Sequence, residues 1–515
     1  MAYDGILNGF TGFSKGDSNF VSAADAIRQA EREARVAHEF ENPYERSAER
    51  AQPARQTRTQ ADVVSPWSQR EASFRTEAAS WQRDAYAQPA YGAHQASAWA
   101  SPAASKAPNV LRFATDESLA AGAAPAFDPD KLRNISEQDR RWSWIEIDLN
   151  AIRSNAAAVK SRIARGTRLL AVVKADGYGH GAVKVAKTAL NSGADYLGVA
   201  SLDEAIQLRE AYVNAPILIL CEPPEASIPL LLGYKIMPSI YTAEFAIKYA
   251  EAADAFGLRA PFHLKVNTGM NRIGVHYSEV VTFMHQVGFH RALELMGTYT
   301  HFATADCPES LDFHIQLKRF AEAVNALAAA GINPGIVHAA NSAAALRYPE
   351  AQFDMVRSGL TLYGYHSCPE TRGIVNLRPA MSVHARVTDT RQVPMSEGVS
   401  YGLQYRSPGS VKICTVPIGY ADGLRRGLSG KVDFVCNGKR FHQVGAICMD
   451  QCMFEVDLRT YGTKRRIEPQ IGDEVVIVGR QGDAEVSIEE MCHVLDTIPY
   501  ELVIGFSHRM PKIYR

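Results

Sequence analysis

From Trp142 to about residue 365, short apolar segments alternate about eight times with segments of helical periodicity. Arg168–Val173 is apolar after its first residue, which is typical of a buried strand, and Ala182–Leu190 follows it with helical spacing. This alternation favours a (β/α)8 barrel, with a doubly wound parallel sheet as the structural alternative. Further strands are expected at Trp144–Leu149, Tyr196–Ala200, Pro216–Leu220, Lys235–Pro238, Phe262–Val266, Leu293–Met296, Gly335–Val337 and Phe353–Val356.

After about Pro379 the helical periodicity largely disappears, and short β-rich segments follow, separated by turn residues such as Asn437-Gly438. Strands are expected here at Met381–Val387, Val411–Val416, Lys431–Val435, Val444–Cys448, Met453–Val456 and Glu474–Val478. We therefore predict a barrel over residues 141–375 and a second, mostly β domain over residues 376–515.

Residues 1–140 differ from the rest in composition. They contain none of the cysteines, are dominated by Ala, Arg, Ser, Gln and Glu, and include low-complexity stretches such as 96–107. Because so few apolar side chains cannot compensate the loss of chain entropy, we predict a largely disordered extension. Ser22–Phe40 is the exception, where Ser22 is suited to cap a short helix. A solvated tail is favoured over a partner-docking segment.

The charge balance narrows the classes of function. The chain has 55 Lys plus Arg and 56 Asp plus Glu, a net charge of −1, which argues against a nucleic-acid or membrane-surface binder. No apolar stretch reaches the ~18 residues of a membrane span. The first ten residues lack the basic region and apolar core of a secretory signal, so we expect a cytoplasmic protein.

The eight cysteines are scattered and lie mostly in apolar segments, which suits reduced thiols in a cytosolic protein better than disulfides. Cys448 and Cys452 are the nearest approach to a metal-binding pair. Their candidate partners, Cys436 and His442, lie in strand-like sequence without paired ligand spacing. No metal site is therefore expected.

The most informative chemical segment is 171–181, which reads Ala-Val-Val-Lys-Ala-Asp-Gly-Tyr-Gly-His-Gly. Lys174 lies at the carboxyl end of a buried strand, where a barrel places its active site. Burial lowers the pKa of an ammonium group, so such a lysine is suited to form a Schiff base. A lysine that only reaches solvent from a strand end is the structural alternative.

This segment resembles the pyridoxal-phosphate signature of alanine racemases, and the resemblance extends from about Trp142 to Arg515. It implies a barrel joined to a C-terminal β domain. It also implies that Lys174 holds pyridoxal 5'-phosphate as an internal aldimine and that Tyr178 lines the site. The first ~140 residues have no counterpart in the resemblance.

Four further segments match the family's order: 297–306, 338–343, 354–364 and 417–423. By resemblance, an arginine faces the pyridine nitrogen and a histidine hydrogen-bonds it, while a second group of residues binds the phosphate. The arginine is Arg357 and the histidine His301; the other cofactor residues are Asn341, Ser342, Gly359, Leu360 and Tyr420. Ser358 replaces the family's usual proline, a mild departure. An arginine at the ring nitrogen stays protonated, weakens the cofactor as an electron sink and so favours simple return of one proton.

Racemisation needs two bases, one on each face of the α-carbon. The resemblance implies that these are Lys174 and Tyr401, with Tyr401 acting across the interface of a head-to-tail homodimer. Arg272 and Met449 would lie beside the substrate carboxylate. In many relatives the lysine at position 265 is carbamylated and orients the arginine; Asn267 replaces an aspartate common in this motif.

The sequence thus predicts an alanine racemase that interconverts L- and D-alanine by two-base proton transfer on the aldimine and supplies D-alanine for peptidoglycan. A serine or broad-specificity racemase is the alternative within the fold. The alternative outside catalysis is a protein that only holds the cofactor, or a scaffold whose function lies in residues 1–140. Proteins that only carry this cofactor resemble the barrel but lack the second domain.

Overall fold

The computed structural model describes residues 136, 140–458, 468–506 and 508–515. The predicted disorder of residues 1–140 and the candidate helix at Ser22–Phe40 therefore fall outside the described residues, apart from positions 136 and 140. Within the described ranges, no helix combines the length and the apolar character needed to cross a bilayer. The same ranges contain no cluster of His, Cys, Asp and Glu suited to a metal ion.

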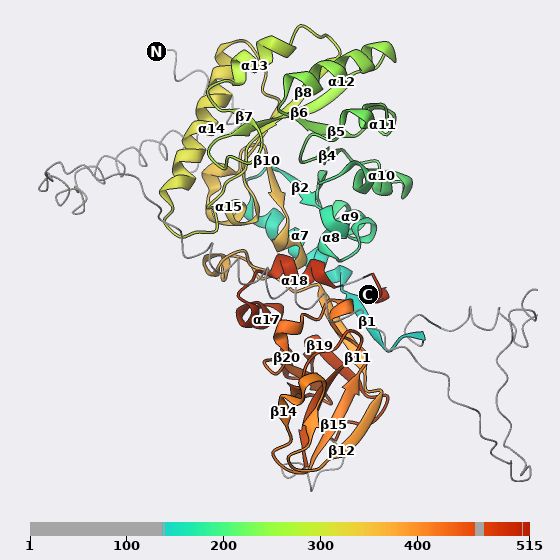
Figure 1. Ribbon diagram of the computed structural model, residues 1–515. Helices are drawn as coiled ribbons and strands as arrows, with labels where there is room; N and C mark the ends of the chain where they lie inside the picture. The colour runs from blue at the N-terminus through green and yellow to red at the C-terminus, as the bar shows by residue number, and fades with distance from the viewer. Residues whose placement is uncertain (1–135, 137–139, 459–467, 507) are drawn as a thin grey trace, which may run out of the picture. The chain divides into compact units, whose positions relative to one another are not determined.

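A closed barrel of parallel strands forms the first half of the described chain (Figure 1). The strands follow one another in the order β5-β4-β3-β2-β10-β9-β8-β6, and β6 pairs back to β5. Their bounds are β2 Arg168–Val172, β3 Tyr196–Val199, β4 Ile217–Ile219, β5 Met237–Ile240, β6 Ala260–Asn267, β8 Leu293–Tyr299, β9 Ile336–His338 and β10 Met355–Ser358. A short strand, β7 (Val275–His276), adds to β6. The predicted (β/α)8 fold class is confirmed.

Helices cover the outside of this barrel, as Figure 1 shows. Their bounds are α7 Leu149–Arg162, α9 Ala182–Asn191, α10 Leu202–Glu210, α11 Ile228–Gly233, α12 Ala243–Ala255, α13 Val280–Val287, α14 Leu311–Ala329 and α15 Ser342–Arg347. Capping residues determine several starts: Asp148 accepts hydrogen bonds from two first-turn amides of α7, and Ser201 forms a capping box with Glu204 at α10.

Strand β1 and the segment from β11 to the end of the chain form a larger, mostly antiparallel sheet in the order β12-β15-β18-β17-β16-β19-β11-β1-β21, with β20 pairing to β19. Its strands are β1 Ser143–Ile147, β11 Met381–Arg386, β12 Asp389–Val393, β15 Val411–Val416, β16 Asp433–Cys436, β17 Lys439–Val444, β18 Cys452–Asp457, β19 Glu474–Gln481, β20 Ala484–Val486 and β21 Lys512–Tyr514. A two-stranded pair, β13 (Gly398–Val399) with β14 (Tyr405–Arg406), and the helices α17 (Ile488–Leu495) and α18 (Pro499–Gly505) complete it.

Two features of this sheet differ from the sequence prediction. Strand β1 pairs antiparallel with β11 and parallel with β21, so the range expected for the barrel, 141–375, includes one strand of the second sheet. The strand expected at Val444–Cys448 lies earlier, as β17, because Asn437-Gly438 closes a hairpin between β16 and β17. One continuous cluster of buried apolar side chains runs through both sheets.

Candidate active site

The carboxyl end of strand β2 leads directly into Lys174, which begins the short element α8 (Lys174–Tyr178). Ala175, Asp176 and Gly177 have φ of 51 to 60° and ψ of 46 to 53°, and Tyr178 has φ of 52°. These residues form a left-handed turn, a conformation that costs roughly 1–2 kcal/mol for each residue other than glycine. The chain therefore holds the segment after Lys174 in an unfavourable backbone conformation.

Contacts from distant parts of the chain hold this turn. Asp176 accepts a hydrogen bond of 2.9 Å from the amide of Ala182 and forms an ion pair with Lys512 of β21. A Cβ atom on Gly181 would lie 1.9 Å from the hydroxyl of Tyr514, so β21 packs directly against the glycine that ends the segment. The C-terminal strand of the second sheet thus supports the turn that carries Lys174.

Lys174 is half-buried at the mouth of the barrel. Burial lowers the pKa of its ammonium group, and the positive charge of Arg272 lowers it further, while Glu204 and Cys221 act in the opposite direction. A lysine in this setting releases its proton more readily than one in water. Its neutral amine is therefore suited to attack a carbonyl group or to act as a base.

Arg357 lies in the barrel interior with 4% of its surface exposed. One amino group donates to Nδ1 of His338 at 3.1 Å; the other donates to Nδ1 of His301 at 3.1 Å and to the carbonyls of Thr300 and Ala339 at 2.8 Å. Among the described residues it forms no ion pair. Burial lowers its pKa to about 10, so the guanidinium stays charged at neutral pH.

The hydrogen bonds that Arg357 donates determine which ring nitrogen carries the hydrogen in the neighbouring histidines. Because guanidinium only donates, Nδ1 of His338 must accept, and the neutral ring then carries its hydrogen on Nε2. That Nε2 lies 2.9 Å from Nδ1 of His263, which must also accept. Burial and the charge of Arg357 lower the pKa values of His263, His301 and His338. The arginine is thus surrounded by neutral acceptors.

Four residues that the resemblance assigns to the cofactor, Asn341, Ser342, Gly359 and Leu360, lie together at the ends of β9 and β10, whereas Tyr420 lies on a loop of the second sheet. Ser342 Oγ accepts from the amide of Gly359 at 2.9 Å, and Asn341 caps α15 by accepting from the amide of Ala344 at 3.0 Å. Leu360 is buried next to Gly359. A Cβ atom on Gly359 would lie 2.7 Å from the hydroxyl of Tyr178, so the glycine permits this close approach.

Sequence reasoning missed Tyr500 of α18. Its ring centroid lies 5.7 Å from that of Tyr178, and burial raises its pKa to about 12. Tyr363 stacks against Tyr178 from another side, at 4.7 Å. No local motif marked Tyr500, because only the packing of α18 brings it to the site; Tyr363 lies within the matched segment 354–364, but no role was assigned to it.

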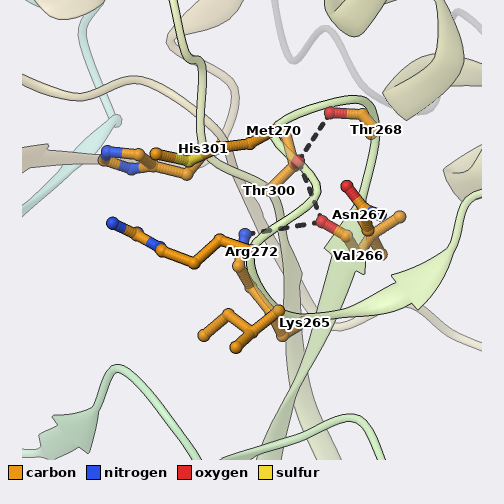
Figure 2. Close-up of a pocket in the computed structure, with 9 residues that line it drawn as sticks. Lys265, Val266, Asn267, Thr268, Met270, Arg272, Thr300 and His301 are labelled. Carbon is orange, nitrogen blue, oxygen red and sulfur yellow. Dashed lines mark hydrogen bonds between the residues drawn. The ribbon is translucent and has the colours of Figure 1, made fainter. Parts of the chain in front are cut away.

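Figure 2 shows the pocket that Lys265 and Arg272 share with Thr300 and His301. Lys265 is buried, and its Nζ lies 3.4 Å from the carbonyl of Val266 and 4.8 Å from the ring centroid of Tyr299. Burial and the charges of Arg357 and Arg272 hold its pKa well below the usual value. The structure thus places Arg272 and Lys265 in one pocket.

Tyr401, Tyr420 and Met449 lie on loops of the second sheet and are 77%, 42% and 53% exposed. Two backbone hydrogen bonds of 3.0 Å join these loops, from Tyr420 to the carbonyl of Cys448 and from Ala421 to that of Met449. The hydroxyl of Ser400 donates to the carbonyl of Ala446 at 2.7 Å. These contacts join the loops that carry the three exposed side chains, and we call Tyr401, Tyr420 and Met449 together the Tyr401 surface. Across the described residues, Tyr401 makes no side-chain hydrogen bond.

Comparison with known proteins agrees with this arrangement. Residues 147–367 match the family described as "Alanine racemase, N-terminal domain", and residues 380–514 match "Alanine racemase, C-terminal domain". The alanine racemases of Symbiobacterium thermophilum and Carboxydothermus hydrogenoformans are each 41% identical to this chain. The aligned segments cover 73% and 72% of this chain and 97% and 99% of those proteins, respectively.

Solved structures give the same result. The alanine racemase of Bacillus anthracis with bound L-Ala-P is 38% identical, with a TM-score of 0.68, covering 73% of this chain and 95% of that one. A histidine racemase from Leuconostoc mesenteroides is 28% identical, with a TM-score of 0.67, covering 73% and 98%. The fold is that of the barrel-type isomerases with a second β domain. The chain belongs to the alanine racemase family, and the predicted resemblance is confirmed.

Acid should destabilise this site. The pKa of His263 falls from 6.5 to about 3 on folding, so between these values the unfolded chain binds a proton that the folded chain does not. We expect the free energy of unfolding to decrease as the pH falls below about 6.5, by up to about 1.4 kcal/mol per pH unit for this group. Urea unfolding at several pH values measures this slope.

His263→Gln should reduce the slope, to which His301 and His338 still contribute, whereas His276→Gln, at an exposed position, should leave it as in the native chain. A native slope in His263→Gln would contradict the assignment of acid sensitivity to this buried histidine.

Proposed function

We propose that this protein is an alanine racemase that uses pyridoxal 5'-phosphate bound covalently to Lys174. The observation that supports it best is the position of Lys174 in a family-matched barrel. Its pKa is lowered, and its strand β2 pairs with β10, the strand of the buried cation Arg357. When bound, the cofactor withdraws electrons from an amino acid and makes its α-hydrogen acidic.

The residues present fit this cofactor. Arg357 has no carboxylate partner among the described residues, which suits a donor directed at a neutral ring nitrogen. Ser342 and the amides of Gly359 and Leu360 supply hydroxyl and N–H groups for a phosphate, with Tyr178 beside them. Asn341 shapes the start of α15, Tyr420 reaches the phosphate by family resemblance, and His301 orients Arg357.

Arg357 determines which reaction follows. Its guanidinium keeps its proton at neutral pH, so a ring nitrogen bound beside it would stay unprotonated and the bound cofactor would be a weaker electron sink. Arg357 would thereby favour simple return of one proton to the substrate over transamination. The neutral histidines accept hydrogen bonds from Arg357 and so hold its guanidinium in one orientation. Because they are neutral, they add no acid that could protonate the ring nitrogen.

Two bases complete the reaction. Lys174 removes or returns a proton on one face of the α-carbon, and Tyr401 does so on the other face. Tyr401 is highly exposed in the single chain, and we propose that it enters the site of a second subunit in a head-to-tail homodimer. The exposed Met449 and Tyr420 would enter with it, because the three residues share the Tyr401 surface.

Arg272 and Met449 bind the carboxylate of the substrate in this proposal, and Tyr420 crowds its side chain, which favours alanine. Serine and broad-specificity racemases remain the alternative. From the family resemblance we also propose that this protein acts in the cytoplasm and that the D-alanine it forms is used for peptidoglycan.

Lys265 is proposed to carry a carbamate. Its neutral amine would attack the carbon of CO2, a nitrogen–carbon bond would form and one proton would leave. The resulting negative charge would lie between Arg272 and Arg357, whose fields disfavour an ammonium at this position. Such a group would orient Arg272 toward the substrate carboxylate.

Chiral analysis of purified protein with L-alanine tests the proposed activity. We expect formation of D-alanine and an absorbance near ~420 nm that depends on the lysine. Lys174→Ala should abolish both. If neither enantiomer is converted while Lys174→Ala still abolishes cofactor binding, the non-catalytic holding role would replace the enzyme. Serine in the same assay measures specificity.

Mixed variants test the shared site. Lys174→Ala and Tyr401→Phe should each be inactive alone, but in a head-to-tail dimer their heterodimer contains one intact site. We expect activity to return to about a quarter of the native value after subunit exchange. A mixture of Tyr401→Phe with Tyr401→Ala is the control and should stay inactive. No recovery despite demonstrated exchange would place Tyr401 and Lys174 in the same subunit.

Carbamylation is measured by ¹³C NMR of the full-length protein equilibrated with ¹³C-bicarbonate. We expect one carbamate resonance that is missing from Lys265→Met, a change that removes the amine and keeps an unbranched, flexible side chain one atom shorter. The matched control is Lys160→Met, a half-exposed lysine that pairs with Asp195. A native spectrum without the resonance would contradict the carbamate.

A further inference from the structure

Glu204 connects Lys174 to the neighbouring strand of the barrel. Its Oε1 accepts a hydrogen bond of 2.6 Å from the amide of Ala175, the residue directly after Lys174. Its Oε2 accepts from the amides of Ala200 and Ser201 at 2.7 and 3.3 Å, where β3 ends. One carboxylate therefore joins the ends of two adjacent strands.

All three partners of this carboxylate are N–H donors. An ionised carboxylate accepts through both oxygens, whereas an amide accepts through one and donates through its nitrogen. Glutamine at position 204 would therefore face the amides of Ala200 and Ser201 with a donor, or would lose the amide of Ala175. The site requires a carboxylate rather than any polar side chain of this length.

Glu204 is itself held firmly. It is the third residue of α10, and its own amide donates to Ser201 Oγ at 3.3 Å in the capping box that starts this helix. The hydrogen bond to Ala175 meets the left-handed turn at its first residue, where φ is 51° and ψ is 53°. A fixed helix start thus holds the strained backbone next to Lys174.

The carboxylate also belongs to the charges that surround Lys174. The other groups that affect the pKa of Lys174 are Arg272 from the segment between β6 and β7, Glu204 from α10 and Cys221 after β4. Burial and the neighbouring positive charges, that of Lys174 among them, lower the pKa of His301, which follows β8. Burial and Arg272 disfavour the ammonium form, and Glu204 favours it. A lysine that both removes and returns a proton needs both forms to be accessible.

We propose that Glu204 is a positioning residue for Lys174: by holding the amide of Ala175 against the end of β3, its carboxylate aims the amine of Lys174 into the site and balances its charge. This inference rests on the proposed covalent attachment of the cofactor to Lys174. Glu204 acts through Lys174 and the backbone beside it.

The chain contains a matched control in Glu222, which follows β4. Its Oε1 accepts from the amides of Tyr241 and Thr242, and its Oε2 accepts from Thr242 Oγ1 at 2.9 Å. Glu222 thus joins the end of β4 to the start of α12, as Glu204 joins β2 to β3. Its hydrogen bonds do not involve the segment that carries Lys174.

The experiment uses the full chain freed of cofactor, as the native protein, Glu204→Gln, Glu204→Asp and Glu222→Gln. Pyridoxal phosphate is added across about pH 6 to 10, and capture is followed by the absorbance near ~420 nm and by borohydride trapping with peptide mass analysis. Hydrogen exchange of the peptide that contains the Ala175 amide is measured without cofactor.

For Glu204→Gln we expect about tenfold weaker capture, faster exchange at Ala175 and a capture midpoint displaced to lower pH, because the ammonium loses its anion. Glu204→Asp keeps the charge but is too short to reach both strands, so it should weaken capture with the native midpoint. Glu222→Gln should match the native protein in all three measurements, even where its thermal stability falls.

Native capture, midpoint and exchange in both Glu204 variants would overturn the proposal. The proposal would also be overturned if the Glu204 variants changed capture, midpoint and exchange only as much as Glu222→Gln does, or if neither Glu204 variant folded. In both cases Glu204 would have a role in stability alone. If the native protein itself is not trapped at Lys174, the proposed function fails instead. The peptide mass distinguishes these results.

Discussion

The left-handed turn after Lys174 is the constraint on which the site depends. Positive φ angles occur there at three residues other than glycine, Ala175, Asp176 and Tyr178. This conformation is unfavourable for a short segment by itself, so contacts from the rest of the protein must stabilise it. The ion pair of Asp176 with Lys512 and the packing of Tyr514 on Gly181 come from the last residues of the chain. Strand β21 therefore supports the geometry in which the barrel presents its lysine, together with the contact that Glu204 makes to Ala175.

This dependence explains how the two sheets cooperate. Strand β1 opens the described chain yet pairs with β11 and β21, so the beginning and end of the described chain meet in one sheet beside the barrel. Helix α18, from the same end of the chain, brings Tyr500 against Tyr178. The second domain thus contributes to the site within one subunit, in addition to the exposed Tyr401 surface that we assign to a partner.

A second constraint is the charge of Arg357. A buried guanidinium without a carboxylate is costly, and here carbonyls and imidazole nitrogens satisfy its donors. Because these acceptors are neutral, they do not compensate the positive charge of Arg357. An electron-rich ligand bound beside it would therefore be stabilised by that charge. Burial and, to a smaller extent, the charge of Arg357 lower the pKa values of His263 and His338, and the hydrogen bond that Arg357 donates determines the tautomer of each neutral ring.

Much of this protein could be predicted from its sequence, because the signals are local. The apolar segments and their periodicity predicted the barrel, and the residues around Lys174, His301, Ser342 and Arg357 carried the family resemblance. Each of these residues follows a barrel strand or lies within one, and parallel strands bring their ends together whatever the loops between them do.

Contacts between distant segments could not be predicted in this way. Nothing near Trp144 indicates that its strand pairs with residues 381–386, and nothing near Tyr500 or Lys512 indicates that they lie beside Tyr178 and Asp176. The strained φ values after Lys174 also contradict the ordinary preferences of alanine and aspartate. The sequence by itself determined which chemical groups the site contains. Only the tertiary structure decided the direction of Lys174, because long-range packing, not local preference, stabilises the turn beneath it.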